Sequence, residues 1–281
     1  MSDRAILVTG ASTGIGNATA RKLAETGYAV FAGVRTRSDA EALAAAGENI
    51  RPVILDVTDA DSVSCAVGAV EESRIPLYGL LNNAGIAGGG PLQYLPPERL
   101  RQVFDVNVFG TMAVTQAAIP LLRAARGRIV TVGSIASRFG SPFVGPYAAS
   151  KAALAVLMDA LRMEMAPFGV SVSLFEFAAV KTPIWSKGRA HREELGTRYP
   201  AQALEDYGRW VDAIMKTIDA EEKHGMEPSV VAAAIAEAFA TPKPKARYVI
   251  GKRAKIQAAV ALLPHATRDA LVRRAIGLEE R

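Results

Sequence analysis

Short apolar runs alternate with helical patterns along most of the chain, and this alternation limits the fold more than any other feature. The runs are rich in Val, Ile and Leu and are mostly apolar on both faces, as buried parallel strands are. They span residues 5–9, 29–34, 51–55, 77–81, 128–132, 170–175 and 247–250. Helical patterns occupy residues 16–26, 39–46, 59–73, 98–123, 147–166 and 229–241. This order predicts an α/β fold with a doubly wound parallel sheet of about seven strands.

Two segments depart from the alternation. No repeat, low-complexity tract or linker divides the 281 residues, so we expect a single domain, 1–281. Residues 182–227 are long, polar and partly helical, and an insertion of this kind in an α/β protein usually lies over the functional site. The pattern in residues 252–281 predicts a helical extension, in which an amphipathic helix pair covers the pocket.

Charge and cysteine content limit the partners and the compartment. The net charge is +5, and the basic residues are scattered, with an enriched patch only near the C-terminus. This distribution favours a solvated surface over nucleic-acid binding. The lone cysteine, Cys65, excludes an internal disulfide and predicts a reducing, cytoplasmic location. No apolar run approaches the ~18 residues of a membrane span, whereas the basic tail leaves peripheral membrane contact open.

A glycine-rich loop joins the first predicted strand to the first predicted helix. Its glycines permit a tight turn and a close approach of backbone N–H groups to a phosphate, and the helix N-terminus adds partial positive charge. A plain strand-to-helix turn is the simpler explanation, but the place at the first strand and helix favours a dinucleotide pyrophosphate site. The predicted contacts are Gly10, Ser12, Thr13, Gly14, Ile15 and Gly16.

The end of the second predicted strand bears on the identity of the dinucleotide. NAD-binding proteins of this architecture often place an acidic residue there for the ribose hydroxyls. This chain has Arg35 and Arg37 instead, and guanidinium groups suit the 2′-phosphate of NADP. Surface solubility is the other explanation for these arginines. The charges therefore favour NADP(H), with NAD(H) as the alternative.

Residues after the third and fourth strands belong to the same predicted edge of the sheet. Asp56 and Val57 follow the third strand, where Asp56 could accept a hydrogen bond from the adenine amino group or could equally well cap a helix. After the fourth strand, side-chain amides can tie neighbouring strand ends together, and Gly85 lets the chain approach a cofactor closely. The predicted cofactor contacts in these two segments are Asp56, Val57, Asn83, Ala84 and Gly85.

Four polar residues could supply proton-transfer chemistry beside such a cofactor. Tyr147 and Lys151 are four apart in a helical pattern and share a face. Ser134 ends the fifth strand, and Asn107 is a polar residue among apolar neighbours in a helical stretch. Reducing a ketone by hydride needs a proton donor at the new alkoxide, and oxidising an alcohol needs a base. A Tyr-xxx-Lys pattern alone means little, but the four residues together predict a catalytic set.

Each of these residue types suits one task. Tyrosine titrates near 10, and we expect the Lys151 ammonium to lower the pKa of Tyr147. The same ammonium could hold the nicotinamide ribose. We therefore expect Tyr147 and Lys151 to contact the cofactor as well. Ser134 can donate a hydrogen bond to the substrate oxygen, and Asn107 can hold a water near Lys151. The hydride would come from the cofactor. The three histidines are widely spaced, so no metal site is predicted.

As a set, these motifs resemble the classical short-chain dehydrogenase/reductase family over about residues 4–183. The matches are Thr9-xxx-Gly14-Ile15-Gly16, Asn82-Asn83-Ala84-Gly85, Asn107, Ser134 and Tyr147-xxx-Lys151. The resemblance implies a seven-stranded Rossmann sheet, an Asn–Ser–Tyr–Lys tetrad, and a homodimer or homotetramer with helices 98–123 and 147–166 between subunits. Residues 30–35 and 247–252 are similar to the hydroxysteroid and retinol dehydrogenase branch, which implies a bulky apolar alcohol or ketone.

One segment departs from the family pattern. The family usually has Pro-Gly after the sixth strand, and this chain has Phe177 and Ala178. Val180 and Thr182, which follow, match residues that the resemblance places near the nicotinamide carboxamide. Losing Pro and Gly removes a rigid turn and a positive-φ option, so we expect a different backbone path there, with altered cofactor binding or substrate shape, or reduced activity.

The leading hypothesis is an NAD(P)(H)-dependent oxidoreductase acting on an apolar secondary alcohol or ketone, with Tyr147 as general acid or base. A non-catalytic NADP-binding sensor or scaffold is the alternative, since the tetrad argues against it but the altered segment at Phe177 argues for it. A lyase or epimerase with the same cofactor is a third possibility. Apolar surface near the mouth is expected from five residues, each of which core packing explains equally well: Phe139, Phe143, Trp185, Trp210 and Met215.

Overall fold

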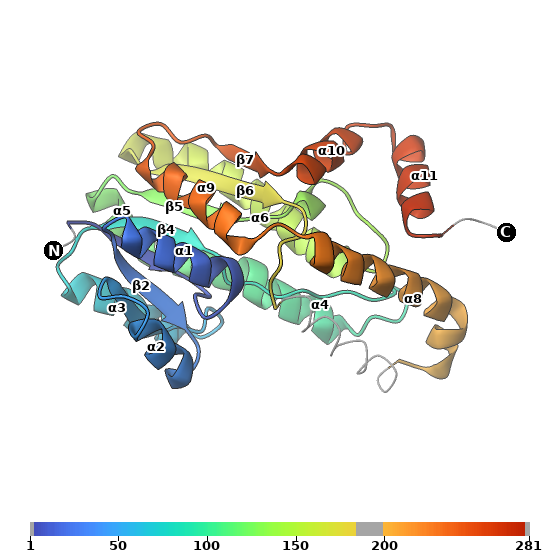
Figure 1. The fold of residues 1–281 in the computed structure, drawn as a ribbon, viewed down its shortest axis with the longest axis horizontal. Helices are drawn as coiled ribbons and strands as arrows, with labels where there is room; N and C mark the ends of the chain where they lie inside the picture. Colours follow the sequence, from blue (N-terminus) through green and yellow to red (C-terminus); the bar gives the residue numbers. More distant parts are fainter. Residues whose placement is uncertain (1–2, 184–198, 279–281) are drawn as a thin grey trace.

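A seven-stranded parallel sheet forms the centre of the molecule (Figure 1). In the computed structural model, which describes residues 3–183 and 199–278, the strand order is β3-β2-β1-β4-β5-β6-β7. The strands are β1 (Ala5–Val8), β2 (Ala29–Val34), β3 (Ile50–Ile54), β4 (Leu77–Asn82), β5 (Arg128–Val132), β6 (Ser171–Phe177) and β7 (Arg247–Ile250). All pairings between these strands are parallel. The predicted Rossmann-type sheet is confirmed.

Helices cover both faces of the sheet. They are α1 (Gly14–Glu25), α2 (Arg37–Ala44), α3 (Ala60–Glu72), α4 (Pro97–Phe104), α5 (Thr111–Ala124), α6 (Gly145–Met165), α8 (Ala201–His224), α9 (Pro228–Ala240), α10 (Lys252–Val260) and α11 (His265–Ala275). One core joins the sheet to α1 and α9, which lie side by side in Figure 1, through residues such as Leu23 and Phe239. A second core joins the other face to α3, α5 and α6, through residues such as Val70, Leu122 and Leu154.

The strand order reverses between β1 and β4. β1 pairs with β2 on one side and with β4 on the other, and the helices that follow β1 and β4 pack on opposite faces. Ligands of open α/β sheets bind outside the carboxyl ends of the strands at such a switch point. The loops after β1 and β4 therefore border the expected site.

The predicted helix 98–123 is interrupted near its middle. α4 ends at Phe104, the π-helical segment Asp105–Gly110 follows, and α5 begins at Thr111. Two neighbouring residues fix the position of this segment. Asn107 forms hydrogen bonds with the main chain of Ile86. Gly110 packs so closely against Val57 that a Cβ on the glycine would lie 2.6 Å from Val57 Cγ2. Apolar periodicity could not reveal one widened turn, since the residues on either side still have a helical pattern.

The insertion and the tail are helical where the structure describes them. α8 fills most of the second half of the predicted insertion 182–227. In the predicted tail 252–281, α10 packs against β6 and β7, whereas α11 has no buried residue. The expected cover of the pocket by this helix pair stays a prediction. Within residues 3–183 and 199–278, no helix combines the length and the apolar character needed to cross a membrane.

Candidate active site

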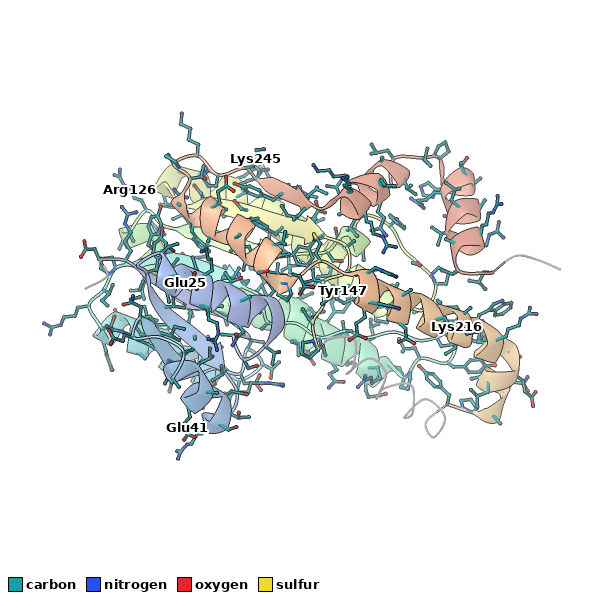
Figure 2. All side chains as sticks on the ribbon, viewed as in Figure 1. Glu25, Glu41, Arg126, Tyr147, Lys216 and Lys245 are labelled. Carbon is teal, nitrogen blue, oxygen red and sulfur yellow. The ribbon has the colours of Figure 1, made fainter. Side chains whose placement is uncertain are left out.

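The residues predicted for catalysis and cofactor binding gather around the carboxyl ends of the strands. The glycine loop follows β1, residues 83–85 follow β4, Ser134 follows β5, and Val180 follows β6. Tyr147 and Lys151 lie in the first turns of α6, and Figure 2 shows Tyr147 near the middle of the molecule. The sheet thus brings together segments that are far apart in the sequence, at the edge where an open α/β sheet binds ligands.

The glycine loop has the backbone that its sequence predicts. Gly10 and Gly14 adopt positive φ angles of 64° and 58°, which residues with a Cβ rarely adopt. Gly16 has no room for a side chain, because a Cβ there would collide with the Gly10 carbonyl oxygen and lie 2.5 Å from Asn83 Nδ2. The three glycines are therefore required by the path of the chain.

The N-terminus of α1 suits an anionic group. Its N-cap residue, Thr13, makes no side-chain capping hydrogen bond, and the first turn holds no acidic residue. The free amide groups and partial charge of such a helix end attract phosphates. Asn17 Nδ2 fixes the loop from inside by donating to the carbonyl oxygens of Ala11 and Ser12 at 3.2 and 3.3 Å. These residues fit a dinucleotide pyrophosphate.

Asn83 and Thr9 tie the β4 loop to the β1 loop. Asn83 Nδ2 donates to the carbonyl oxygens of Thr9 and Gly10, both at 3.0 Å. In return, the main-chain N–H groups of Asn83 and Ala84 donate to Thr9 Oγ1, both at 2.9 Å. The expected tie between strand ends is present, and a direct cofactor contact of Asn83 or Ala84 stays a prediction. The importance of the Thr9 hydroxyl was missed, although its place at a strand end next to glycine was a usable signal.

The side chain of Asn107 is buried and fully engaged by the protein. Ile86 N donates to Asn107 Oδ1 at 2.8 Å, and Asn107 Nδ2 donates to Ile86 O and to Ser150 Oγ, both at 3.0 Å. Ser150 Oγ donates in turn to the carbonyl oxygen of Tyr147 at 2.7 Å. Asn107 therefore links the β4 loop to the helix that carries Tyr147. The role of Ser150 was not predicted from the sequence. The water that Asn107 was expected to hold near Lys151 stays a prediction.

Gly85 lies directly beside two members of the predicted tetrad. A Cβ on Gly85 would be 3.2 Å from Asn107 Oδ1 and 3.7 Å from Lys151 Nζ. The third member, Ser134, caps the short 3₁₀ turn η2 (Ile135–Ser137), because Ala136 N donates to Ser134 Oγ at 3.2 Å. The Ser134 side chain also interacts with the Tyr147 hydroxyl and lowers its pKa in part. The structure thus brings all four predicted catalytic residues into one cluster.

The electrostatics of Tyr147 differ from the expectation. Burial raises the pKa of Tyr147, and only the hydrogen bond with Ser134 lowers it in part. This contradicts the expected lowering by Lys151, which is not among the groups that shift the pKa of Tyr147. Burial lowers the pKa of the Lys151 amine as well, to about 8. Lys151 Nζ donates to the carbonyl oxygen of Val132 at 2.8 Å and lies 5.9 Å from the centre of the Tyr147 ring.

The side chains predicted for the adenosine end lie at the ends of β2 and β3. Arg35 is exposed after β2, and Arg37 is the exposed first residue of α2. Asp56 Oδ1 accepts hydrogen bonds from Thr58 N at 2.9 Å and Thr58 Oγ1 at 2.7 Å, which lower the pKa of Asp56, with a smaller effect from Arg35. Asp56 therefore closes a turn with Thr58 and does not cap a helix, since the N-cap of α3 is Asp59. The adenine contact of Asp56 stays a prediction. Val57 packs against Gly110.

The segment that departs from the family pattern closes the opposite side of the site. β6 continues through Phe177, and Val180 forms a parallel bridge with Met226. Lys181 N donates to Met226 O at 3.0 Å, which fixes the chain just before Thr182. Thr182 then packs against Gly14 of the glycine loop. Phe177 and Ala178 adopt no positive φ, so this path does not need the glycine that is missing.

Phe143, just before α6, belongs to a cluster of aromatic side chains centred on Tyr207 of α8. The rings of Phe143 and Tyr207 meet at 5.9 Å, and Tyr207 also contacts Tyr94 and Trp210, both at 6.0 Å. Of the other predicted mouth residues, Phe139 is half-buried, Trp185 lies outside the described residues, and the Met215 side chain is likewise not described.

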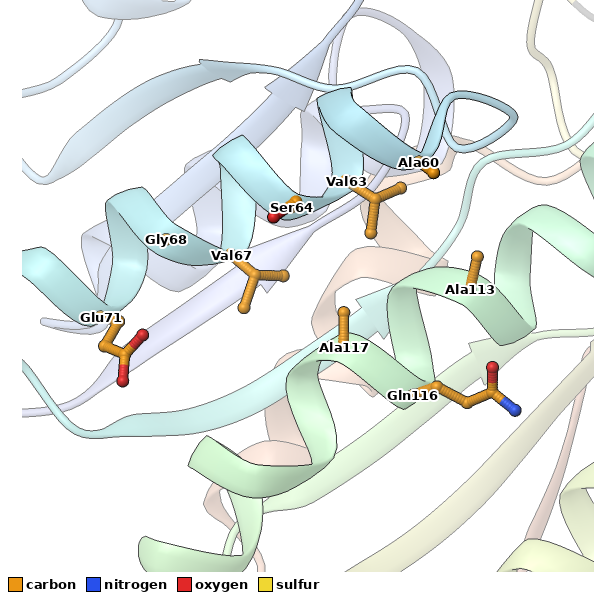
Figure 3. A pocket seen from close by; sticks show the side chains of 9 residues that line it. All are labelled: Ala60, Val63, Ser64, Val67, Gly68, Glu71, Ala113, Gln116 and Ala117. Atoms are coloured by element: carbon orange, nitrogen blue, oxygen red, sulfur yellow. The ribbon is translucent and has the colours of Figure 1, made fainter.

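A shallow groove of about 460 Å³ lies elsewhere, between α3 and α5 (Figure 3). Small and apolar residues such as Val63, Val67 and Ala117 line much of it, and none of its lining residues belongs to the predicted site. In the part of the chain that the structure describes, no group of three or more His, Cys, Asp or Glu side chains could hold a metal ion.

Comparison with known families decides the relationship that the motifs suggest. The profile described as short chain dehydrogenase matches residues 4–193. The chain belongs to the short-chain dehydrogenase family. This short-chain dehydrogenase is 37% identical over 275 residues to an NADPH-dependent 3-dehydrocapnine reductase from Ornithobacterium rhinotracheale, with 95% of each protein covered. The predicted family is thereby confirmed.

Two further relatives support the same family. Retinol dehydrogenase 16 from Rattus norvegicus is 33% identical over 263 residues, which cover 91% of this short-chain dehydrogenase and 83% of the relative. A crystal structure of a short chain dehydrogenase from Burkholderia cenocepacia in complex with NADP matches with a TM-score of 0.72 and 26% identity, covering 98% and 99% of the two chains. The chain is thus an NAD(P)-dependent oxidoreductase of this family.

Proposed function

We propose that this short-chain dehydrogenase interconverts an apolar secondary alcohol and its ketone, with Tyr147 as the proton-transferring residue. The observation that carries the proposal is the cluster of Tyr147, Ser134 and Lys151 beside Gly85. Gly85 lies in the β4 loop, which Asn83 ties to the glycine loop. Because burial raises the pKa of Tyr147, its hydroxyl stays protonated at neutral pH. A protonated hydroxyl can donate to the oxygen when a ketone is reduced, whereas oxidation of the alcohol needs the same group to act as a base.

The residues around the glycine loop would hold the dinucleotide. The loop and the α1 N-terminus would take the pyrophosphate, and Val180 and Thr182 would flank the nicotinamide end. When bound, the nicotinamide supplies the hydride. Arg35 and Arg37 support NADP(H) over NAD(H), since guanidinium groups pair well with a 2′-phosphate. One relative is named an NADPH-dependent reductase and another was solved with NADP, which supports the same preference.

The chain's own side chains would then handle the substrate oxygen. Ser134 donates a hydrogen bond to the carbonyl oxygen, Tyr147 Oη gives its proton to the developing alkoxide, and Lys151 holds the ribose with its buried amine. Asn107 keeps this arrangement in place through Ile86 and Ser150. The aromatic rings of Phe143 and Tyr207 support an apolar substrate, as does the similarity to a retinol dehydrogenase.

We also propose that the protein forms a homodimer or homotetramer. Phe109, Val156 and Met163 lie on the π-helical segment and on α6, and their exposed fractions are 64%, 68% and 62%. Large exposed apolar residues on neighbouring helices support a subunit contact. A cytoplasmic location and peripheral membrane contact stay predictions.

A ketone panel with NADPH tests the function. Consumption of NADPH with at least one apolar ketone supports the oxidoreductase. Tight NADPH binding with no turnover across the panel would instead support the alternative function, a sensor or scaffold, which the missing Pro-Gly turn at Phe177 and Ala178 leaves open.

A further inference from the structure

Glu176 is a fully buried carboxylate in β6 that none of the predicted functions uses. A buried charge is stable only where partners satisfy it. Glu176 Oε1 accepts hydrogen bonds from Ser137 Oγ at 3.0 Å and Arg138 Nε at 3.1 Å, and Oε2 accepts from Arg138 Nη2 at 2.6 Å. The Arg138 fork is therefore bidentate, an arrangement that fixes direction as well as distance.

Both partners of Glu176 belong to the short turn that Ser134 begins. Ser134 holds the near end of this turn, because its Oγ accepts from Ala136 N at 3.2 Å and its carbonyl oxygen accepts from Ser137 N at 3.0 Å. Glu176 holds the far end through Ser137 and Arg138. A shift of the far end would move the Ser134 hydroxyl, since few bonds separate them.

A second arginine connects Glu176 to the helix of Tyr147. Arg247 of β7 places Nη1 3.6 Å from Glu176 Oε1, and its Nη2 donates to Asp159 of α6. Ser137, Arg138 and Arg247 are thus the polar and charged partners that the structure gives for Glu176. The carboxylate lies between the turn that carries Ser134 and the strand that is paired to α6 through Asp159.

Stability alone is a weak reason for such a cluster. Replacing a buried ion pair by well-packed apolar residues is often neutral or stabilising, because desolvation offsets the attraction. An ionic cluster adds a defined geometry, and here its bidentate contact fixes the turn that begins at Ser134.

We propose that Glu176 is a positioning residue that holds the Ser134 turn in place for proton transfer at Tyr147. The inference rests on the proposed function, and it assigns Glu176 no contact with substrate or cofactor. The bidentate bond to Arg138 is its main point of attachment, and Ser137 is the second.

Four variants test the positioning role: Arg138→Ala, Arg138→Lys, Glu176→Gln and, as the control, Asp159→Asn. Arg138→Ala should lower kcat about 10- to 100-fold, as expected for a displaced catalytic group, with an unchanged Kd for NADPH. Its pH–rate curve should move to higher pH, because a displaced Ser134 no longer lowers the pKa of Tyr147.

The other variants grade the effect. Arg138→Lys keeps the charge, so its kcat should fall less than that of Arg138→Ala. Glu176→Gln should lower kcat about as much as Arg138→Ala does. Asp159→Asn leaves the Ser134 turn bonded to Glu176 and should behave as the wild type.

The outcomes separate the inference from the function on which it rests. An active wild type with an unchanged kcat and pH profile in Arg138→Ala would overturn the positioning role alone, and so would equal losses in Arg138→Ala and Asp159→Asn. An inactive wild type would refute the proposed function.

Hydrogen exchange at amides 135–138 decides whether Glu176 holds the turn even if the wild type is inactive. We expect faster exchange of these amides in Arg138→Ala than in Asp159→Asn. Equal exchange rates in the two variants would overturn the inference. Because Arg138 is about one quarter exposed, its variants should fold even where Glu176→Gln does not.

Discussion

The side chain of Thr182 lies against the backbone of Gly14, so closely that a Cβ on Gly14 would be 2.9 Å from Thr182 Cγ2. Gly14 begins α1 on the β1 side of the sheet, and Thr182 follows the bridge formed by Val180. The two ends of the predicted cofactor site therefore share one contact. A substitution of either Gly14 or Thr182 can therefore disturb both the pyrophosphate end and the nicotinamide end of that site.

Gly14→Ala should weaken cofactor binding and lower stability together. The new Cβ meets Thr182, and the φ of 58° disfavours any residue with a Cβ by about 1–2 kcal/mol. We expect the NADPH Kd to rise about tenfold or more, measured by fluorescence titration beside urea unfolding. Gly68→Ala in α3 is the matched control, because no heavy atom lies within 4 Å of its Cβ position, and it should stabilise by about 0.5–1 kcal/mol. Equal behaviour of the two variants would contradict the contact.

Tyr147→Phe should remove turnover and leave the cofactor site intact. The loss of the proton donor should lower kcat by about 10²- to 10⁴-fold, while the Kd for NADPH stays within a factor of about two of the wild type. Tyr28→Phe removes a tyrosine hydroxyl far from Ser134 and should keep full activity. Retention of most activity in Tyr147→Phe would refute the assigned mechanism.

Lys151 should make the stability of the protein depend on alkaline pH. Its pKa falls from 10.5 to about 8 on folding, so between these values the unfolded chain binds the extra proton and stability rises with pH. Lys151→Met removes the buried amine and should be more stable than the wild type at pH 7, by up to about 3 kcal/mol. This difference should shrink as the pH approaches 10.5.

Urea unfolding of wild type and Lys151→Met at neutral and alkaline pH measures this difference. Lys22→Met changes an exposed lysine and should give no comparable pH dependence. A difference between wild type and Lys151→Met that stays constant with pH would show that the amine keeps its ordinary pKa in the folded protein.

Arg35→Ala should discriminate between the two dinucleotides. Loss of a charge-assisted bond to the 2′-phosphate should raise the NADPH Kd about 10- to 100-fold and leave the NADH Kd nearly unchanged. Arg101→Ala, an exposed arginine of α4, serves as the control for a general charge effect. Equal changes for NADPH and NADH would remove the case for NADP.

Phe109→Glu should dissociate the proposed oligomer. A charge on this exposed apolar position disfavours burial between subunits, and the folded subunit should persist because Phe109 is outside the core. Sedimentation of the variant beside the wild type measures the assembly. A wild type that sediments as a monomer would contradict the oligomer itself.

The sequence predicted the parts of the molecule that local pattern determines. Buried strands such as β1 and β2 show their apolar runs without interruption, and the glycines that need positive φ stand where the chain turns from β1 into α1. The tetrad could be predicted for a similar reason, because its residue types, spacing and order are specific. The structure then brings Ser134, Tyr147 and Lys151 together.

Long-range partners could not be predicted from the same patterns. Nothing local to Asn107 indicates that its amide bonds to the main chain of Ile86, or that a π-helical turn places it there. Glu176 is an acidic residue in an apolar run, but its partners Arg138 and Arg247 are 38 and 71 residues away in the chain. The prediction for the pKa of Tyr147 was wrong for a related reason, because the burial of Tyr147 depends on packing by several elements.

The π-helical segment Asp105–Gly110 also restricts how this part of the sequence can change in evolution. A widened turn holds one residue more than an α-helical turn, so deleting one residue from it would close the turn and leave Val114, Ala118 and Leu122 of α5 in the core. A deletion within α5 itself would instead rotate the rest of that helix by about 100°. The effect of a shorter segment would fall on the turn itself, where Asn107 bonds to Ile86. Descendants of this sequence that keep Asn107 should therefore keep the length of the segment even where its other residues change.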